Sequence, residues 1–85
     1  MSNLNLGIIG AGNIAMKHLE VISEINRLNV VGITSRTPHK AKRLANKFSI
    51  KKIYPDFETL FNNNKLDGIL VLVSSDQIYK VLNKI

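Results

Sequence analysis

Apolar residues gather in four short runs along the 85-residue chain, and more polar segments separate these runs. The runs at residues 29–35 and 68–73 are almost continuously apolar, as expected for parallel strands covered on both faces of a sheet. We predict that both are strands, together with residues 4–9 and a short segment at residues 52–54. The chain therefore has the strands for one small sheet.

The segments between these strands carry the spacing of amphipathic helices. The first predicted helix covers residues 13–27, and the second follows Thr37 as N-cap with Pro38 at its first position. A short third helix begins at Pro55-Asp56 and ends at Asn62-Asn-Asn64, and a fourth follows the Ser74-Ser-Asp76 turn. The apolar positions are Ala15, Leu19, Ile22 and Ile25, then Ala41, Leu44, Ala45 and Phe48, then Phe57, Leu60 and Phe61, and finally Ile78, Val81, Leu82 and Ile85.

The regular alternation of strands and helices indicates an α/β fold. Right-handed crossovers place the strands in one Rossmann-like parallel sheet, in the spatial order 3-2-1-4, with helices on both faces. A complete doubly wound domain continues beyond the fourth strand, so we expect residues 1–85 to form an incomplete one. Because an apolar strand with a free edge invites pairing, we expect a homo-oligomer through the last strand or the last helix.

The junction between the first strand and the first helix reads Leu6-Gly-Ile-Ile-Gly-Ala-Gly-Asn-Ile-Ala15. It contains the dinucleotide-binding fingerprint Gly-x-Gly-x-x-Gly with alanine in the third glycine position. Gly10 permits the tight turn, Gly12 lets a pyrophosphate approach the backbone, and Ala15 lets the helix pack closely against the strand.

The phosphates would face the free N–H groups at the start of that helix. The alternative is a glycine-rich turn that binds nothing. We predict a dinucleotide site formed here by Gly10, Ala11, Gly12, Asn13, Ile14 and Ala15.

The residues after the second strand bear on which dinucleotide binds. Sites that prefer NAD usually place a carboxylate at the end of this strand, and this chain has Ser35 there. Arg36 offers a guanidinium to a 2′-phosphate, with hydroxyl groups from Ser35 and Thr37 and a further charge from Lys40. We therefore predict NADP in preference to NAD; the alternative is that Arg36 is a solvated turn residue.

The net charge of +6 at pH 7 raises the question of a nucleic-acid partner. Seven of the twelve basic residues lie between Arg36 and Lys52, a span without an acidic residue. The segment has no interleaved aromatic residues for base stacking, and it follows the strand beside which adenosine would lie. We predict no nucleic-acid partner. The two other interpretations are that the segment is a solvated basic face, or that part of it binds a phosphorylated cofactor.

Other features of the sequence exclude several classes of protein. No apolar run is as long as a membrane span, the N-terminus lacks the pattern of a signal peptide, and cysteine is absent. We therefore expect a cytoplasmic protein without a membrane partner and without a metal site. His18 lies on the apolar side of the first helix, where it either bonds locally or takes a direct role near the cofactor.

Taken together, these segments resemble the N-terminal domain of the glucose–fructose oxidoreductase / inositol dehydrogenase family (Gfo/Idh/MocA). The resemblance covers essentially the whole chain. It implies binding of NAD or NADP and hydride transfer between nicotinamide and a hydroxyl-bearing carbon, usually of a sugar or polyol. Its carriers are residues 7–15 with His18-Leu19, Ser35-Arg-Thr37 with Lys40-Ala41, Leu44-Ala45 and Phe48, then Tyr54-x-Asp56 and Leu66-Asp-Gly68.

The chain departs from the family pattern in two places. The family follows its fourth strand with Thr-Pro-Asn and a histidine three residues on, where this chain has Ser74-Ser-Asp76 and then Tyr79. We still expect Val73, Ser74 and Ser75 to lie beside the cofactor at the carboxyl end of that strand, and Asp76 is also a candidate helix N-cap.

The second departure concerns catalysis. The family's catalytic lysine lies in a Glu-Lys-Pro segment on the next strand, and a C-terminal domain builds much of its substrate site. Neither is among residues 1–85, and Lys80 and Lys84 do not match that motif. We name no catalytic residue and expect an oxidoreductase domain that is inactive alone; the alternative is a stand-alone nucleotide-binding or sensing module.

Overall fold

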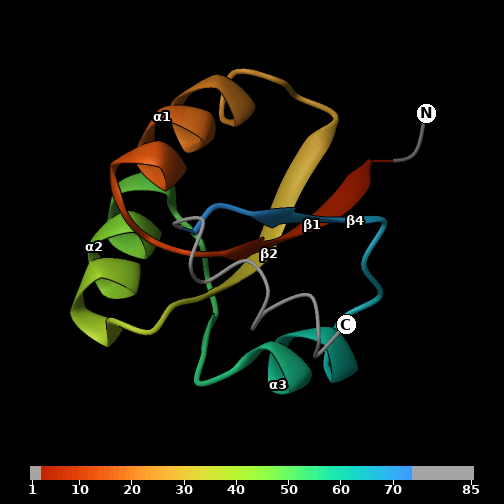
Figure 1. Cartoon of the computed structure of the whole chain (residues 1–85). Helices are drawn as coiled ribbons and strands as arrows, with labels where there is room; N and C mark the ends of the chain where they lie inside the picture. The colour runs from red at the N-terminus through yellow and green to blue at the C-terminus, as the bar shows by residue number, and fades with distance from the viewer. Residues whose placement is uncertain (1–2, 74–85) are drawn as a thin grey trace.

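The computed structural model describes residues 3–73, in which strands and helices alternate along the chain (Figure 1). The predicted fourth helix and its candidate cap Asp76 lie outside this range. The elements are β1 (Leu4–Ile9), α1 (Asn13–Ile22), β2 (Leu28–Thr34), α2 (Pro38–Phe48), β3 (Ile53–Tyr54), α3 (Phe57–Asn62) and β4 (Gly68–Val71).

The four strands form one parallel sheet in the order β3-β2-β1-β4, which confirms the predicted order 3-2-1-4. The central strand β1 pairs on both sides: Ile8 is opposite Ile33 of β2 and Leu70 of β4. The carboxyl end of β1, which leads into the glycine-rich turn, therefore lies between the carboxyl ends of two neighbours.

The pairing of β1 with β2 contains one irregularity. Leu6 is opposite Val30, but the next residue, Gly7, is opposite Gly32, so Val31 is an extra residue in β2. Side chains alternate between the two faces of a regular strand. The extra residue resets this alternation, and Val30 and Ile33 both pack into the same apolar cluster.

Helices cover both faces of the sheet: α1 and α2 pack on one face and α3 on the other (Figure 1). Consecutive residues of β1 supply the two clusters, since Ile8 faces α1 and α2 whereas Ile9 faces α3. The larger cluster contains Ile8, Ala15, Leu19, Ile33, Ala41, Leu44, Ala45 and Ile50. The smaller one contains Ile9, Phe57 and Leu60, with Tyr54, Leu66, Ile69, Val71 and Val73 packed against it.

The first helix is shorter than predicted, because it ends at Ile22 and not near residue 27. Beyond Ser23 the chain switches to tighter turns, in which the N–H of Ile25 donates to the carbonyl of Ile22 at 3.0 Å. This turn brings the chain back to the sheet, where Leu4 donates to the carbonyl of Arg27 at 2.7 Å. Ile25 consequently lies outside the helix with 43% of its surface exposed, and its predicted place on the buried face is wrong.

The remaining boundaries differ by one or two residues. The fourth strand ends at Val71 and not at residue 73, although the N–H of Leu72 still donates to the carbonyl of Ile9 at 2.7 Å. Thr37 is the N-cap of α2 as predicted, but its side chain makes no cap hydrogen bond. No helix within residues 3–73 is long and apolar enough to cross a membrane.

Candidate functional site

The turn after β1 requires glycine at its first position. Gly10 has φ = +114°, which L side chains rarely adopt, and its N–H donates to the carbonyl of Thr34 at 2.8 Å. A Cβ at this position would overlap the carbonyl group of Leu72. The turn is therefore fitted between the ends of β2 and β4, as the fingerprint predicts.

Gly12, the second glycine of the fingerprint, has open surroundings where Gly10 has crowded ones. Gly12 is the N-cap of α1 with φ = −85°, an angle open to any residue, and no heavy atom lies within 4 Å of where its Cβ would be. Its missing side chain therefore leaves open space and serves no internal contact. That space lies at the start of α1, where the N–H groups of the first turn have no side-chain cap. Such a place favours an anionic group such as a pyrophosphate.

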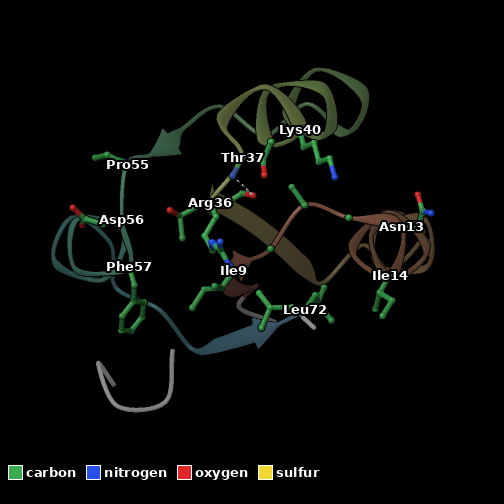
Figure 2. Close-up of a pocket in the computed structure, with 16 residues that line it drawn as sticks. Ile9, Asn13, Ile14, Arg36, Thr37, Lys40, Pro55, Asp56, Phe57 and Leu72 are labelled. Carbon is green, nitrogen blue, oxygen red and sulfur yellow. Dashed lines mark hydrogen bonds between the residues drawn. The ribbon is translucent and has the colours of Figure 1, made fainter. Parts of the chain in front are cut away.

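This space is part of a cleft of about 750 Å³ at the carboxyl ends of the strands (Figure 2). Every predicted site residue within the described range lines it, with one exception. The lining residues are Ile9, Gly10, Ala11, Gly12, Asn13, Ile14, Thr34, Ser35, Arg36, Thr37, Lys40, Pro55, Asp56, Phe57, Leu72 and Val73.

The exception is Ala15, which has no exposed surface and belongs to the larger apolar cluster. Its place agrees with the role of the third small residue of the fingerprint, which is to let the helix pack against the sheet. Ala15 thus does not line the cleft directly. Ser74 and Ser75, the other two predicted site residues, lie outside the described range.

The turn from β2 to α2 places polar groups along one wall of the cleft. The N–H of Thr37 donates to the hydroxyl oxygen of Ser35 at 3.1 Å, so the hydroxyl proton of Ser35 is still available to a ligand. Arg36 is exposed, and Figure 2 shows its side chain extending over the cleft toward Ile9. Lys40 follows at the first turn of α2 and extends toward the α1 side of the cleft.

The wall of the cleft that Pro55, Asp56 and Phe57 form was not predicted from the sequence. These residues follow β3, whose carboxyl end shares the same edge of the sheet, so the topology was the available signal. Asp56 caps α3, because its carboxylate accepts hydrogen bonds from the N–H and the hydroxyl of Thr59 at 2.8 and 2.7 Å. The cleft therefore has an acidic side at Asp56 and a basic side at Lys40.

His18 makes a local contact within its own helix and not a contact in the cleft. Its Nδ1 lies 2.9 Å from the carbonyl oxygen of Ile14, one turn earlier in α1, and the residue does not line the cleft. Within residues 3–73, no group of three or more histidine or acidic residues is placed to hold a metal ion.

Comparisons with known proteins agree with this geometry. Residues 4–85 match the model of an oxidoreductase family with an NAD-binding Rossmann fold, GFO_IDH_MocA. An inositol 2-dehydrogenase of Acidothermus cellulolyticus is 30% identical over 70 residues, which are 81% of this chain and 20% of that relative.

Two solved structures have the same fold at low sequence identity. GenD2 from gentamicin A biosynthesis, in complex with NAD, has a TM-score of 0.88 at 14% identity and covers 99% of this chain and 24% of its own. KijD10, a 3-ketoreductase from Actinomadura kijaniata in complex with NADP and TDP-benzene, has a TM-score of 0.84 at 20% identity. The match covers 98% of this chain and 26% of KijD10.

This chain thus spans about a fifth to a quarter of the length of the proteins that it resembles. The match to the family model begins with the first residue of β1 and includes the whole cleft. The chain belongs to the Gfo/Idh/MocA oxidoreductase family and is similar to its NAD-binding Rossmann domain.

Proposed function

We propose that this chain is the cofactor-binding part of an NAD(P)-dependent oxidoreductase that transfers hydride between nicotinamide and a hydroxyl-bearing carbon of a sugar or polyol. The observation that carries the proposal is the open space beside Gly12, which lies at the start of α1 and lines the cleft. The family match supports the same chemistry. The cofactor, when bound, supplies the hydride acceptor or donor.

The residues of the chain bind and orient this group. The backbone N–H groups after Gly12 donate to the pyrophosphate, and the positive φ of Gly10 keeps the turn clear of it. The carboxyl end of β2 holds the adenosine ribose near Ser35. Val73 borders the cleft on the β4 side, and we expect Ser74 and Ser75 to continue this border.

Hydride transfer needs a bound cofactor, a positioned substrate and a proton acceptor. The cleft provides groups for the first of these. We therefore expect the 85-residue chain to bind nucleotide without oxidising a polyol. Turnover of myo-inositol by this chain alone would contradict that expectation, and binding without turnover also fits the alternative of a nucleotide-sensing module.

We further propose that the site prefers NADP(H) to NAD(H). Acidic side chains repel a 2′-phosphate, and the only one that lines the cleft in the described part of the chain is Asp56, on the wall away from Lys40. The residue at the end of β2 is Ser35, and Arg36 follows it with its side chain over the cleft. A guanidinium group and two hydroxyl groups match the donors that a phosphate accepts.

Calorimetric titration of the chain with NADPH and with NADH at low ionic strength tests both proposals. We expect NADPH to bind more tightly, and Arg36→Ala to weaken NADPH binding on the order of 10- to 100-fold with little effect on NADH. Arg27→Ala, which removes an exposed charge outside the cleft, is the matched control. Equal affinities for the two nucleotides would contradict the preference, and the absence of binding would contradict the site.

We also propose a cytoplasmic location, with which the absence of cysteine from residues 1–85 is compatible. Detection of the protein in the soluble fraction of fractionated cells, and not in the periplasm or medium, would test it.

A further inference from the structure

One side of α1 carries a row of apolar residues that the other elements of residues 3–73 leave exposed. Ile14 and Val21 are two helical turns apart on this side, and 55% and 60% of their surfaces are exposed. Ile25 continues the row after the helix ends and is 43% exposed. We call these three residues the α1 stripe. Single exposed apolar residues are ordinary on a protein surface, but a row along one helix is typical of a contact surface.

The neighbouring helix shows which way the α1 stripe faces. The Nζ of Lys47 in α2 lies 3.9 Å from the sulfur of Met16 and 3.9 Å from a carboxylate oxygen of Glu20, so this flank of α1 faces α2. The stripe lies on the other flank. Since α2 packs on β2 and β3, that flank faces the β4 end of the sheet, and there Ile14 lines the cleft together with Leu72.

Leu4 extends this surface onto the sheet. Its N–H donates to the carbonyl of Arg27, so the start of β1 lies beside the turn that contains Ile25. Side chains alternate between the faces of a strand, and Ile8 faces α1 and α2, so Leu4 lies on that same face. Leu4 is 41% exposed. Of the six large apolar residues exposed within residues 3–73, four thus belong to α1, to the turn after it or to the sheet face that it covers.

Two opposite charges border the α1 stripe, and neither has an ion-pair partner in the described part of the chain. Lys17 and Glu24 are seven positions apart, so they lie on one flank of the stripe, toward its two ends. When a second copy is turned by half a revolution about an axis perpendicular to α1, the two helices run antiparallel. Lys17 of each copy then faces Glu24 of the other, whereas parallel helices would bring like charges together.

We propose that the α1 stripe docks a second copy of this chain, in a two-fold contact in which the α1 helices run antiparallel. Val21 lies near the axis, and Ile14 of one copy lies against Ile25 of the other. Burial of these apolar side chains supplies the attraction, and the two Lys17–Glu24 pairs set the direction of the helices. Ten residues of helix are about 15 Å long, so the contact is small and the dimer should dissociate on dilution.

The substitution Val21→Glu tests this surface in the 85-residue chain without nucleotide. Val21 is exposed and glutamate is a better helix former than valine, so the variant should fold. Ile53→Glu is the matched control, because Ile53 is also an exposed aliphatic residue but lies on β3, at the other end of the sheet. Circular dichroism checks that both variants fold, and sedimentation equilibrium over about a 100-fold range of concentration measures the dimer.

We expect the parent chain to form a dimer and no larger assembly, because a two-fold contact uses the same surface of both copies. Val21→Glu should weaken the dimer more than about 30-fold, since near the axis each glutamate is buried against the other copy. Ile53→Glu should leave the dissociation constant within about 2-fold of the parent.

Exchange of the two charges tests the direction of the helices. Lys17→Glu and Glu24→Lys should each weaken the dimer about 3- to 30-fold, since either change places like charges opposite each other twice. The double substitution restores both pairs, so the dissociation constant should return to within about 3-fold of the parent.

Several results would overturn the proposal. A parent chain that is monomeric at every concentration would do so, and so would assemblies larger than a dimer. A dimer that Val21→Glu leaves intact would show that the contact lies elsewhere, such as at the free edge of β4. Absence of recovery in the double variant would overturn the antiparallel arrangement.

Discussion

Replacing Gly12 with valine should separate cofactor binding from folding. The backbone of Gly12 has φ = −85°, and a Cβ there has no heavy atom within 4 Å. Valine is a poorer N-cap than glycine, and this lowers the free energy of unfolding by about 0.5–1 kcal/mol. Valine also restricts the unfolded chain, and this raises the free energy of unfolding by about 0.4–1 kcal/mol. The two effects oppose each other, so we expect the free energy of unfolding to change by less than about 1 kcal/mol.

The effect on binding should be far larger, since the added methyl groups occupy the space beside the first turn of α1. Hydrogen bonds to a charged group contribute about 1.5–3 kcal/mol each, and loss of two of them lowers affinity at least ~100-fold. Urea unfolding followed by circular dichroism measures the stability, and calorimetric titration with NADPH measures the affinity. Gly12→Ser introduces a residue that caps helices well, so this variant should also lose NADPH affinity while its free energy of unfolding is no lower than that of the parent.

The matched variant is Gly10→Ala, for which we expect the reverse. Alanine adds one atom, but at φ = +114° that atom would overlap the carbonyl group of Leu72, so this variant should be the one that loses its fold. NADPH affinity within about 3-fold of the parent in folded Gly12→Val protein would refute the assignment of the space to pyrophosphate.

Three further predictions concern stability and assembly. Leu60 is fully buried in the cluster under α3, so Leu60→Ala should lower the free energy of unfolding by about 2–5 kcal/mol in urea titrations; a loss under about 1 kcal/mol would contradict this packing. Asp67 accepts a hydrogen bond from the N–H of Asn5 at 2.7 Å, so Asp67→Ala should cost about 1 kcal/mol by the same assay, whereas Asp67→Asn should recover part of it. Since β4 is one of the two edge strands of the described sheet, sedimentation at increasing concentration should reveal association, and a monomer at all concentrations would count against it.

The strand order and the glycine-rich turn were predictable because each depends on local chemistry or on a general rule. Only glycine suits the φ of Gly10, and the handedness of crossovers leaves few ways to order four parallel strands. The cleft then follows from topology, since the carboxyl ends of parallel strands share one edge. For this reason the sequence alone predicts that Ser35, Arg36 and Lys40 line the cleft, as they do.

What could not be predicted depends on distances between elements. A smaller cavity of about 120 Å³, lined by Met16 of α1 and Arg43 of α2, depends on the spacing between these helices, which no local pattern encodes. The early end of α1 depends on where β2 must begin, and the helical spacing that included Ile25 carries no such information. The acidic wall at Asp56 was not predicted, because the sequence pattern indicated only that a short helix begins at this residue.

The extra residue in β2 has a consequence for how related sequences can differ in length. Without a bulge, a single deletion in a strand turns every later side chain to the opposite face. Removal of Val31 would instead leave Leu6 opposite Val30 and Gly7 opposite Gly32, the partners that they already have. We therefore expect the fold to tolerate deletion of Val31 in related sequences, at a position upstream of the end of the strand that lines the cleft.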